Sequence, residues 1–129
     1  MEDYHKAKKQ LDSLIGKIKF NPDSNLKLER IRELLNILDN PQDKFQSIHI
    51  GGTSGKGSTS TLTASILREA GYKVGLHTSP YLQVVSEGFQ INGELISSHK
   101  LLELTNKVMT AIDKMEVGAT YFEANVAIA

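Results

Sequence analysis

Glycines, a lysine and hydroxyl side chains crowd the segment 51–60, which reads Gly-Gly-Thr-Ser-Gly-Lys-Gly-Ser-Thr-Ser. Glycines let a backbone turn sharply and bring its N–H groups close to an anion. The N-terminus of a following helix would add unpaired N–H donors and a partial positive charge. Lys56 can reach further along a polyphosphate, and Ser58 or Thr59 can place a hydroxyl near Mg²⁺. The segment therefore predicts a site for the phosphates of a nucleotide.

The segment departs from the strict phosphate-loop pattern at two positions. Counted back from Gly55 and Lys56, the first glycine arrives one position late, at Gly51, and Gly57 replaces the usual serine or threonine. A glycine-rich turn that only reverses the chain would explain the same residues. We favour the phosphate site because glycine, lysine and hydroxyl residues lie together between an apolar, strand-like run and a helix-compatible segment.

The composition indicates a globular protein without cysteine chemistry. Its 129 residues suffice for one domain with a buried core. Fifteen acidic and fifteen basic residues balance, so no strong field attracts nucleic acid or an anionic membrane. The absence of cysteine excludes disulfides, thiol catalysis and thiolate metal sites. Because there is no long apolar run and no signal-peptide core, we expect a cytoplasmic protein without nucleic-acid or membrane partners.

The elements around the glycine segment follow from hydrophobic spacing. Apolar residues at helical intervals predict helices over 4–15 and from about 26 to 38, which we interpret as packing elements. Residues 45–50 then read as a strand that enters the glycine segment, and 59–70 as the helix that leaves it. A second strand is predicted over 72–77.

This order of strand, loop, helix and strand is a βαβ unit, whose two strands should lie parallel with a right-handed crossover. The predicted fold class is α/β, with a mostly parallel sheet flanked by helices as in P-loop NTPases. We predict a helical segment over 1–44 and the front part of an ATP-binding phosphate-loop domain over 45–129.

The rest of the chain predicts a hairpin and two more helices. Asn92-Gly93 is a strong turn signal and would close a β-hairpin over 89–96. A long amphipathic helix should begin at Ser97 or Ser98. The final segment, 121–129, begins another apolar helix and then simply ends, with no cap and no polar tail after it. We therefore expect the chain to be the front part of a longer protein.

Two further side chains could act beside the phosphates. Ser79 follows the predicted second strand, at the edge where open α/β sheets bind ligands, although it could equally be a turn hydroxyl before Pro80. Glu123 is the only carboxylate of the apolar segment 121–129, so either that face is exposed or the carboxylate faces a cation. The histidines do not pair at metal-ligand spacing, and we predict structural or surface roles for His5, His49, His77 and His99.

Four motifs, in this order and spacing, resemble the folylpolyglutamate synthase/dihydrofolate synthase family of the Mur ligase superfamily. The family's His-Val-x-Gly-Thr-Asn-Gly-Lys-Gly-Ser signature is matched by His49–Ser58, and its Gly-Tyr-x-Val-Gly-Leu-x-Thr-Ser-Pro run by Gly71–Pro80. The Asn-Gly-Glu-x-Ile-Ser element is matched within Phe89–Ser97, and Thr-x-Phe-Glu by Thr120–Glu123. The unusual Lys-Gly-Ser is itself a mark of the family.

The resemblance implies an ATP-dependent ligase. ATP would phosphorylate a folate- or pteroate-type carboxylate, and the amine of glutamate would then attack the acyl phosphate. Lys56 would be the catalytic residue on the outer phosphates, and Ser79 and Glu123 match positions that bind Mg²⁺ in the family. The residues implied to bind the triphosphate of ATP are Gly52, Thr53, Ser54, Gly55, Lys56, Gly57 and Ser58. The implied partners are ATP, glutamate, folate or dihydropteroate, and the remainder of the protein's own chain.

One departure from the family bears on the substrate. Where the family usually has Phe-Asn-Glu-Arg-Ile in the substrate-facing loop, this chain has Val85–Phe89, with Gly88 in place of the arginine. The implied ATP site is untouched by this change. Two alternatives stay open: another Mur-type amide ligase acting on a different carboxylate, and a non-catalytic nucleotide-binding module.

Overall fold

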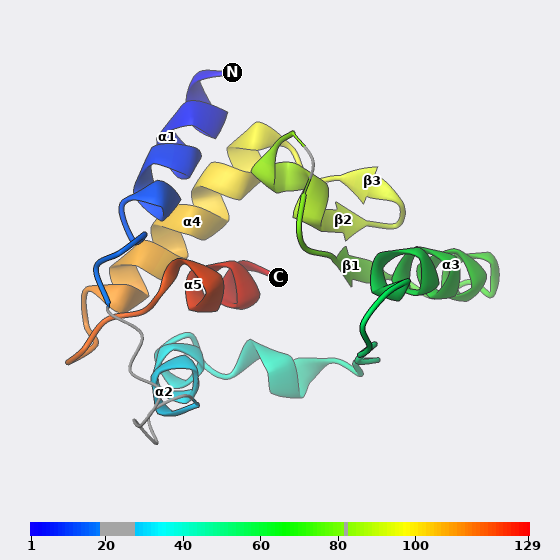
Figure 1. Ribbon diagram of the computed structural model, residues 1–129, viewed down its shortest axis with the longest axis horizontal. Coiled ribbons are helices and arrows are strands. Elements are labelled where there is room, and N and C mark those ends of the chain that lie inside the picture. Colours follow the sequence, from blue (N-terminus) through cyan, green and yellow to red (C-terminus); the bar gives the residue numbers. More distant parts are fainter. Residues whose placement is uncertain (19–27, 82) are drawn as a thin grey trace. The chain divides into compact units, whose positions relative to one another are not determined.

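The computed structural model describes residues 1–18, 28–81 and 83–129 as an α/β protein (Figure 1). In chain order its elements are α1 (Glu2–Asp12), α2 (Glu29–Ile37), α3 (Lys56–Glu69), β1 (Gly75–His77), β2 (Phe89–Ile91), β3 (Glu94–Leu95), α4 (Ser98–Ile112) and α5 (Tyr121–Ile128), with short 3₁₀ helices at Pro41–Lys44 and Val85–Gly88. Among the residues described, no helix is long and apolar enough to cross a membrane.

The chain folds into two compact units. The helical unit comprises Met1–Gln46 and His99–Ile128, and the loop unit comprises Ser47–Ser98 together with Ala129. The structure thus groups the C-terminal helices with the N-terminal ones. The predicted division into a helical segment, 1–44, and the front part of an ATP-binding domain, 45–129, stays a prediction.

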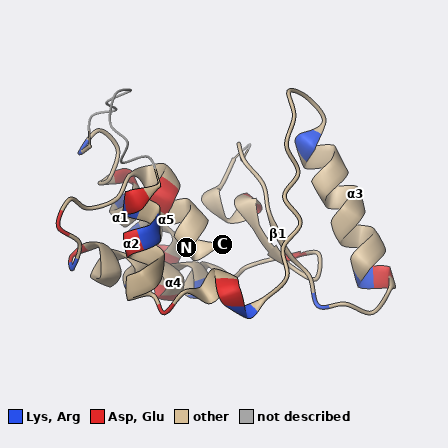
Figure 2. Cartoon of the chain, turned by 90° about the horizontal axis from the view of Figure 1, so that it is seen from below, with Lys and Arg blue, Asp and Glu red and all other residues tan. Residues whose placement is uncertain are grey.

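The helical unit holds most of the buried apolar side chains. The predicted helices over 4–15 and 26–38 appear as α1 and α2, although residues 26 and 27 lie outside the described residues. Buried positions recur every three or four residues along α1 and α4, as an amphipathic helix requires. The buried apolar residues of the whole unit are Ala7, Leu11, Leu14, Leu34, Leu101, Val108, Ala111, Ile112, Met115, Ala119, Ala124 and Ile128, and Thr105 of α4 is buried among them. Charged residues recur along the helices of this unit (Figure 2).

The sheet of the loop unit is antiparallel, in the order β1-β2-β3. Asn92 and Gly93 have φ angles of +51° and +85°, as a tight hairpin turn needs, so the predicted hairpin is confirmed. Asn92 also extends the pairing beyond β1. Its N–H donates to the carbonyl of Val74, and its side-chain oxygen accepts the N–H of Val74, each at 2.8 Å.

The structure does not show the strand predicted over 45–50. These residues form no strand, and the apolar side chains of Phe45 and Ile48 are exposed. A strand forms only where a neighbour pairs with its N–H and C=O groups, and within the described residues nothing pairs with 45–50 in a ladder. The second strand is likewise shorter than predicted and begins at Gly75. The α/β class is confirmed, whereas the strand pairs of residues 1–18, 28–81 and 83–129 are antiparallel and do not confirm the parallel pair.

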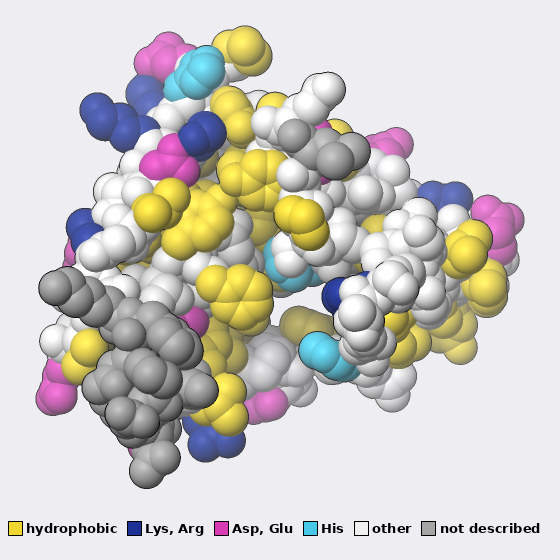
Figure 3. Space-filling view, in the orientation of Figure 1, with side chains coloured by type: hydrophobic (Ala, Val, Ile, Leu, Met, Phe, Trp, Pro, Cys, Tyr) yellow, Lys and Arg dark blue, Asp and Glu magenta, His cyan; other side chains and the backbone are white. Residues whose placement is uncertain are grey.

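Helix α3 runs beside the sheet and keeps no side chain fully buried. It begins at Lys56, earlier than the predicted start at 59, and ends at Glu69. Gly71, the predicted stop, follows its C-cap with a φ of +90°. Its charged residues stand only near its two ends (Figure 2). Apolar side chains lie on its surface (Figure 3), and those of Leu62 and Ile66 are 65% and 69% exposed.

Candidate functional site

The glycine segment forms an exposed loop that leads directly into α3. Gly52 and Gly55 have φ angles of +145° and +76°, which side-chain-bearing residues rarely adopt. Gly55 is the residue immediately before the helix, and no side chain caps the N-terminus of α3. The first helical hydrogen bond runs from the N–H of Thr59 to the carbonyl of Gly55, at 2.9 Å. The N–H groups that precede it, from Lys56 to Ser58, lie at the positive end of the helix dipole.

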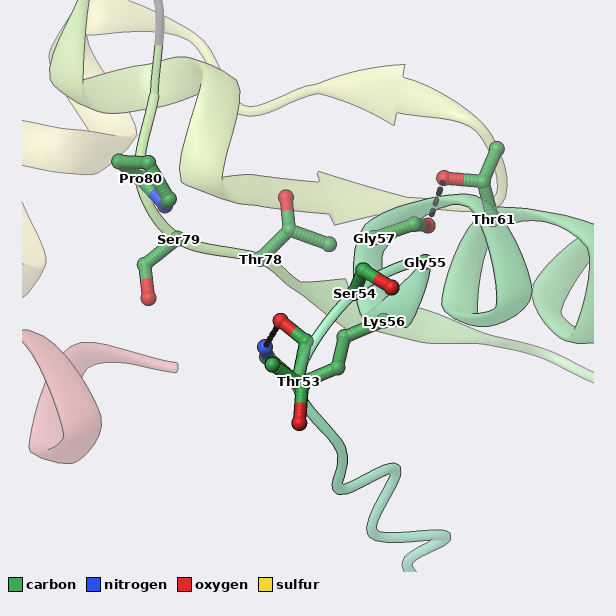
Figure 4. A pocket seen from close by; sticks show the side chains of 9 residues that line it. All are labelled: Thr53, Ser54, Gly55, Lys56, Gly57, Thr61, Thr78, Ser79 and Pro80. Atoms are coloured by element: carbon green, nitrogen blue, oxygen red, sulfur yellow. Dashed lines mark hydrogen bonds between the residues drawn. The ribbon is translucent and has the colours of Figure 1, made fainter.

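Lys56 folds back over the loop from the first turn of α3. Its Nζ donates to the carbonyl of Gly52 at 2.7 Å. It also donates to the carbonyl of Thr53 at 3.2 Å (Figure 4). The ammonium group is exposed and stays close to the loop. The structure therefore places one full positive charge and the positive end of a helix dipole at the same place.

A pocket of about 320 Å³ opens between this loop and the segment that follows β1. It is lined by Thr53, Ser54, Gly55, Lys56, Gly57, Thr61, Thr78, Ser79 and Pro80 (Figure 4). Five of the seven predicted phosphate-binding residues line it, together with the predicted metal ligand Ser79. Gly52 and Ser58 do not line it, although the carbonyl of Gly52 holds Lys56.

Sequence reasoning missed the pocket residues Thr61 and Thr78. Thr61 lies one helical turn beyond Gly57, and its hydroxyl donates to the Gly57 carbonyl at 2.9 Å. The interval of four residues between Gly57 and Thr61 could have predicted this position, because residues four apart lie on one face of a helix. Thr78 directly precedes Ser79 in the Thr-Ser-Pro run, and this adjacency to a predicted ligand is the signal that could have found it.

The segment after β1 is fixed by contacts around Gly88. The Gly88 carbonyl accepts the N–H of Thr78 at 3.1 Å and lies 2.8 Å from Nδ1 of His77. The His77 ring also stacks on Phe89, with ring centroids 5.0 Å apart. This bears out the structural role predicted for His77. A Cβ atom at Gly88 would lie 3.0 Å from the carbonyl oxygen of Thr78, so the backbone here leaves little room for a side chain.

Glu123 belongs to the helical unit, where its carboxylate is buried and paired. Nε of Arg30 lies 3.2 Å from Oε1 and 3.3 Å from Oε2. Thr120 donates to Oε2 through its N–H and its hydroxyl, both at 2.8 Å, and accepts the N–H of Glu123 at 3.2 Å. Thr120 and Glu123 thus form a capping box at the start of α5. The sequence left open whether the Glu123 face is exposed or faces a cation. The structure shows that the carboxylate faces a cation, the guanidinium group of Arg30.

The structure places the two predicted metal ligands in different units, Ser79 in the loop unit and Glu123 in the helical unit. That both reach one Mg²⁺ stays a prediction. In the part of the chain that the structure describes, no three His, Cys, Asp or Glu side chains gather as a metal cluster. Sequence reasoning missed Arg30, which stands 93 positions from Glu123. The capping box had a local signal, Thr-x-x-Glu before an apolar run.

Comparison with known proteins gives relatives over nearly the whole chain. No family model matches the sequence. A dihydrofolate synthase/folylpolyglutamate synthase of Bacillus subtilis is 38% identical over 118 residues, which are 88% of this chain and 27% of that protein. The crystal structure of folylpolyglutamate synthase from Thermotoga maritima is 35% identical, with a TM-score of 0.81, and the match covers 95% of this chain and 29% of that one.

A folylpolyglutamate synthase in complex with AMPPCP and folate is also similar. It is 29% identical, with a TM-score of 0.83, over 95% of this chain and 31% of that one. The chain thus spans between a quarter and a third of the length of these proteins. In sequence and in fold it is similar to folylpolyglutamate synthase/dihydrofolate synthase enzymes, which confirms the family resemblance of its motifs.

Proposed function

We propose that this chain is the phosphate-binding part of an ATP-dependent ligase that joins glutamate to a folate- or pteroate-type carboxylate. The observation that carries the proposal is the loop of Gly52–Ser58, where Lys56 and the N-terminus of α3 meet at one pocket. The names of the relatives support the same activity, and one solved relative holds the ATP analogue AMPPCP together with folate.

Binding of a triphosphate follows from what the loop offers. N–H groups from Lys56 to Ser58 can donate to phosphate oxygens, as at other helix N-termini. Lys56 can turn from the carbonyls of Gly52 and Thr53 toward the outer phosphates, because both bonds are exposed and local. Its charge would then offset the negative charge on the transferring phosphoryl group.

The ligation itself has two steps. An oxygen of the acceptor carboxylate attacks the γ-phosphorus of ATP, and ADP leaves with the electrons of the broken P–O bond. The amine of glutamate then attacks the acyl carbon, loses a proton, and releases inorganic phosphate as the amide forms. In the first step this chain would hold and orient the phosphates, which is most of what phosphoryl transfer asks of a protein.

The candidate ligands for Mg²⁺ are compatible with the ion. The Ser79 hydroxyl lines the pocket, and the Glu123 carboxylate has one oxygen, Oε1, that is not engaged by the helix cap. Hydroxyl and carboxylate oxygens are the hard ligands that Mg²⁺ takes, with water completing its shell. When bound, the ion would offset negative charge on the phosphates. We propose Ser79 and Glu123 as its protein ligands.

The mostly parallel P-loop sheet and a cytoplasmic location remain proposals for the whole protein. Residues 45–50 keep the apolar, β-type sequence of a strand although they are unpaired here. A neighbouring strand would satisfy their N–H and C=O groups and bury Ile48. Hydrogen exchange at 46–50 in the whole protein would test this, and fast exchange there would contradict a paired strand.

The test of the ligase proposal is an assay of the protein as its gene encodes it, with ATP, glutamate and a pteroate or folate acceptor. We expect ADP, phosphate and a glutamylated product in equal amounts. ATP binding without any product from a range of carboxylates would favour the non-catalytic nucleotide-binding module.

One observation favours a second acceptor class. This loop has Gly88 where the family usually has an arginine, so that position offers no cation to the substrate. The backbone there also leaves little room for a side chain, because a Cβ atom would lie 3.0 Å from the carbonyl oxygen of Thr78. A Mur-type ligase acting on a different carboxylate is therefore the second candidate. Product formed from another acceptor at rates well above those with folate and pteroate would select it.

A further inference from the structure

The carboxylate of Glu123 is buried in the helical unit beside a cation that sequence reasoning did not find. The side chain of Glu123 is 9% exposed and that of Arg30 is 18% exposed. A carboxylate at this depth is costly unless it is paired and hydrogen-bonded. Arg30, on α2, and Thr120, just before α5, supply that pairing from opposite ends of the sequence.

The two carboxylate oxygens are held differently. Oε2 accepts two hydrogen bonds of 2.8 Å from Thr120, so the helix cap fixes it. Within the described part of the chain, the hydrogen bond that Oε1 accepts comes from Arg30 alone, at 3.2 Å. The cap therefore fixes the orientation of the whole carboxylate, including Oε1. Among the described residues, Arg30 alone donates a hydrogen bond to Oε1.

The contact with Arg30 is loose for an ion pair. A single N–H, on Nε, is shared between the two oxygens at 3.2 Å and 3.3 Å. Strong guanidinium–carboxylate pairs use two parallel N–H bonds at roughly 2.7 to 2.9 Å. Oε1 is thus a pre-oriented ligand whose present partner can be exchanged. Mg²⁺ is usually bound through one or two carboxylates, with waters completing its octahedral shell.

We propose that Arg30 is the resident counter-ion of Glu123 and that it competes with the divalent cation for Oε1. The inference rests on the proposed metal role of Glu123. Two cations that share one oxygen oppose each other, and the opposition is reciprocal. Arg30 stabilises the metal-free protein, and binding of the ion must weaken or break the Arg30–Glu123 pair.

The test compares Arg30→Gln with the wild type in the protein as its gene encodes it. Isothermal calorimetry would give the affinity for a non-hydrolysable ATP analogue in Mg²⁺ and in EDTA, and the ratio of the two reports the contribution of the metal. We expect this ratio to rise by about fivefold or more in Arg30→Gln, at the lower end of typical coupling between sites. The unfolding midpoint in EDTA should fall, because Glu123 then lacks its counter-ion.

Arg32→Gln is the matched control, since it removes the same charge from an exposed position of α2. We expect it to leave the ratio and the unfolding midpoint unchanged. Arg30→Lys serves if Arg30→Gln does not fold. It keeps the charge but loses the Nε–H, so the ratio should rise less than in Arg30→Gln.

The outcomes separate this inference from the proposed function. An unchanged or lower ratio in a folded Arg30 variant, with a clear Mg²⁺ effect in the wild type, overturns the competition and leaves the metal site standing. A ratio near one in both proteins overturns the metal role of Glu123 and the competition together. A ratio that rises equally in Arg32→Gln overturns the specific role of Arg30, because any charge on α2 would then act alike.

Discussion

The two units of this protein place stability and chemistry in different parts of the chain. The helical unit buries most of the apolar core, and α4 alone contributes five buried residues. In the loop unit, α3 contributes none, although it begins at the candidate phosphate site. Binding loops are generally drawn from the less stable regions of a protein. Apart from Glu123 and its partner Arg30, we therefore expect substitutions in the loop unit to change binding, and those in the helical unit to change folding.

The largest effect should come from Lys56→Ala. Lys56 is the cation of the pocket, and the partners of its ammonium group among the described residues are the exposed carbonyls of Gly52 and Thr53 in its own loop. We expect ligase turnover to fall by about a hundredfold or more, as for other groups that stabilise transition-state charge. Unfolding should be unaffected. Lys73→Ala, at an exposed position of the same unit, is the control. Equal turnover in Lys56→Ala and the wild type would contradict the phosphate-loop assignment.

Leucine truncations on the two kinds of helix test the contrast in stability. Leu101 of α4 is fully buried, whereas Leu62 of α3 is 65% exposed. Leu101→Ala should lower the free energy of unfolding by about 2 to 5 kcal/mol, because it removes buried methyl groups and leaves a cavity. Leu62→Ala should change it by less than about 0.5 kcal/mol. Urea denaturation measures both. A loss at Leu62 as large as that at Leu101 would show that α3 is covered in solution.

The same contrast explains which features could be predicted from the sequence. The hairpin at Asn92-Gly93 and the stop of α3 just before Gly71 depend on a few neighbouring residues, and both were predicted. The strand over 45–50 depends on a partner elsewhere, so its apolar pattern alone was misleading. The candidate phosphate loop could be located from the sequence because its residues are contiguous, and five of them line one pocket. The pairing of Arg30 with Glu123 joins residues 93 positions apart, and no local pattern reports it.

Gly55→Ala should have a smaller effect, confined to the loop. Gly55 has a φ of +76°, and nothing lies within 4 Å of a Cβ atom added there. The cost is therefore backbone strain alone, about 1 to 2 kcal/mol for a residue with a side chain. Gly57→Ala is the matched control, since its Cβ would also meet open space and its φ is ordinary. Thermal unfolding compares the two. Equal midpoints would mean that the left-handed turn before α3 is not kept in solution.

Thr105→Val should stabilise the helical unit. The Thr105 hydroxyl is fully buried on α4 and has no hydrogen-bond partner among the residues described. A buried polar group without a partner costs about 1 to 3 kcal/mol, and valine has nearly the same shape. We expect a gain of about 1 kcal/mol by urea denaturation. Thr110→Val is the control, because that hydroxyl is exposed and donates to the Asn106 carbonyl. A loss of stability in Thr105→Val would mean that the hydroxyl has a partner in solution.

The smallest effect concerns the acid side of the pH range and also belongs to the helical unit. Lys100 donates to Glu103 at 2.8 Å, and this hydrogen bond and the nearby positive charge lower the pKa of Glu103 below its usual 4.5. A carboxyl whose pKa is lower in the folded state contributes stability above its unfolded pKa and loses it as the pH falls. Glu103→Gln should therefore lower the unfolding midpoint slightly near neutral pH and leave it unchanged well below pH 4.5. The pair is exposed, so added salt should reduce the difference further. An equal shift of the midpoint at both pH values would assign the effect to packing instead of charge.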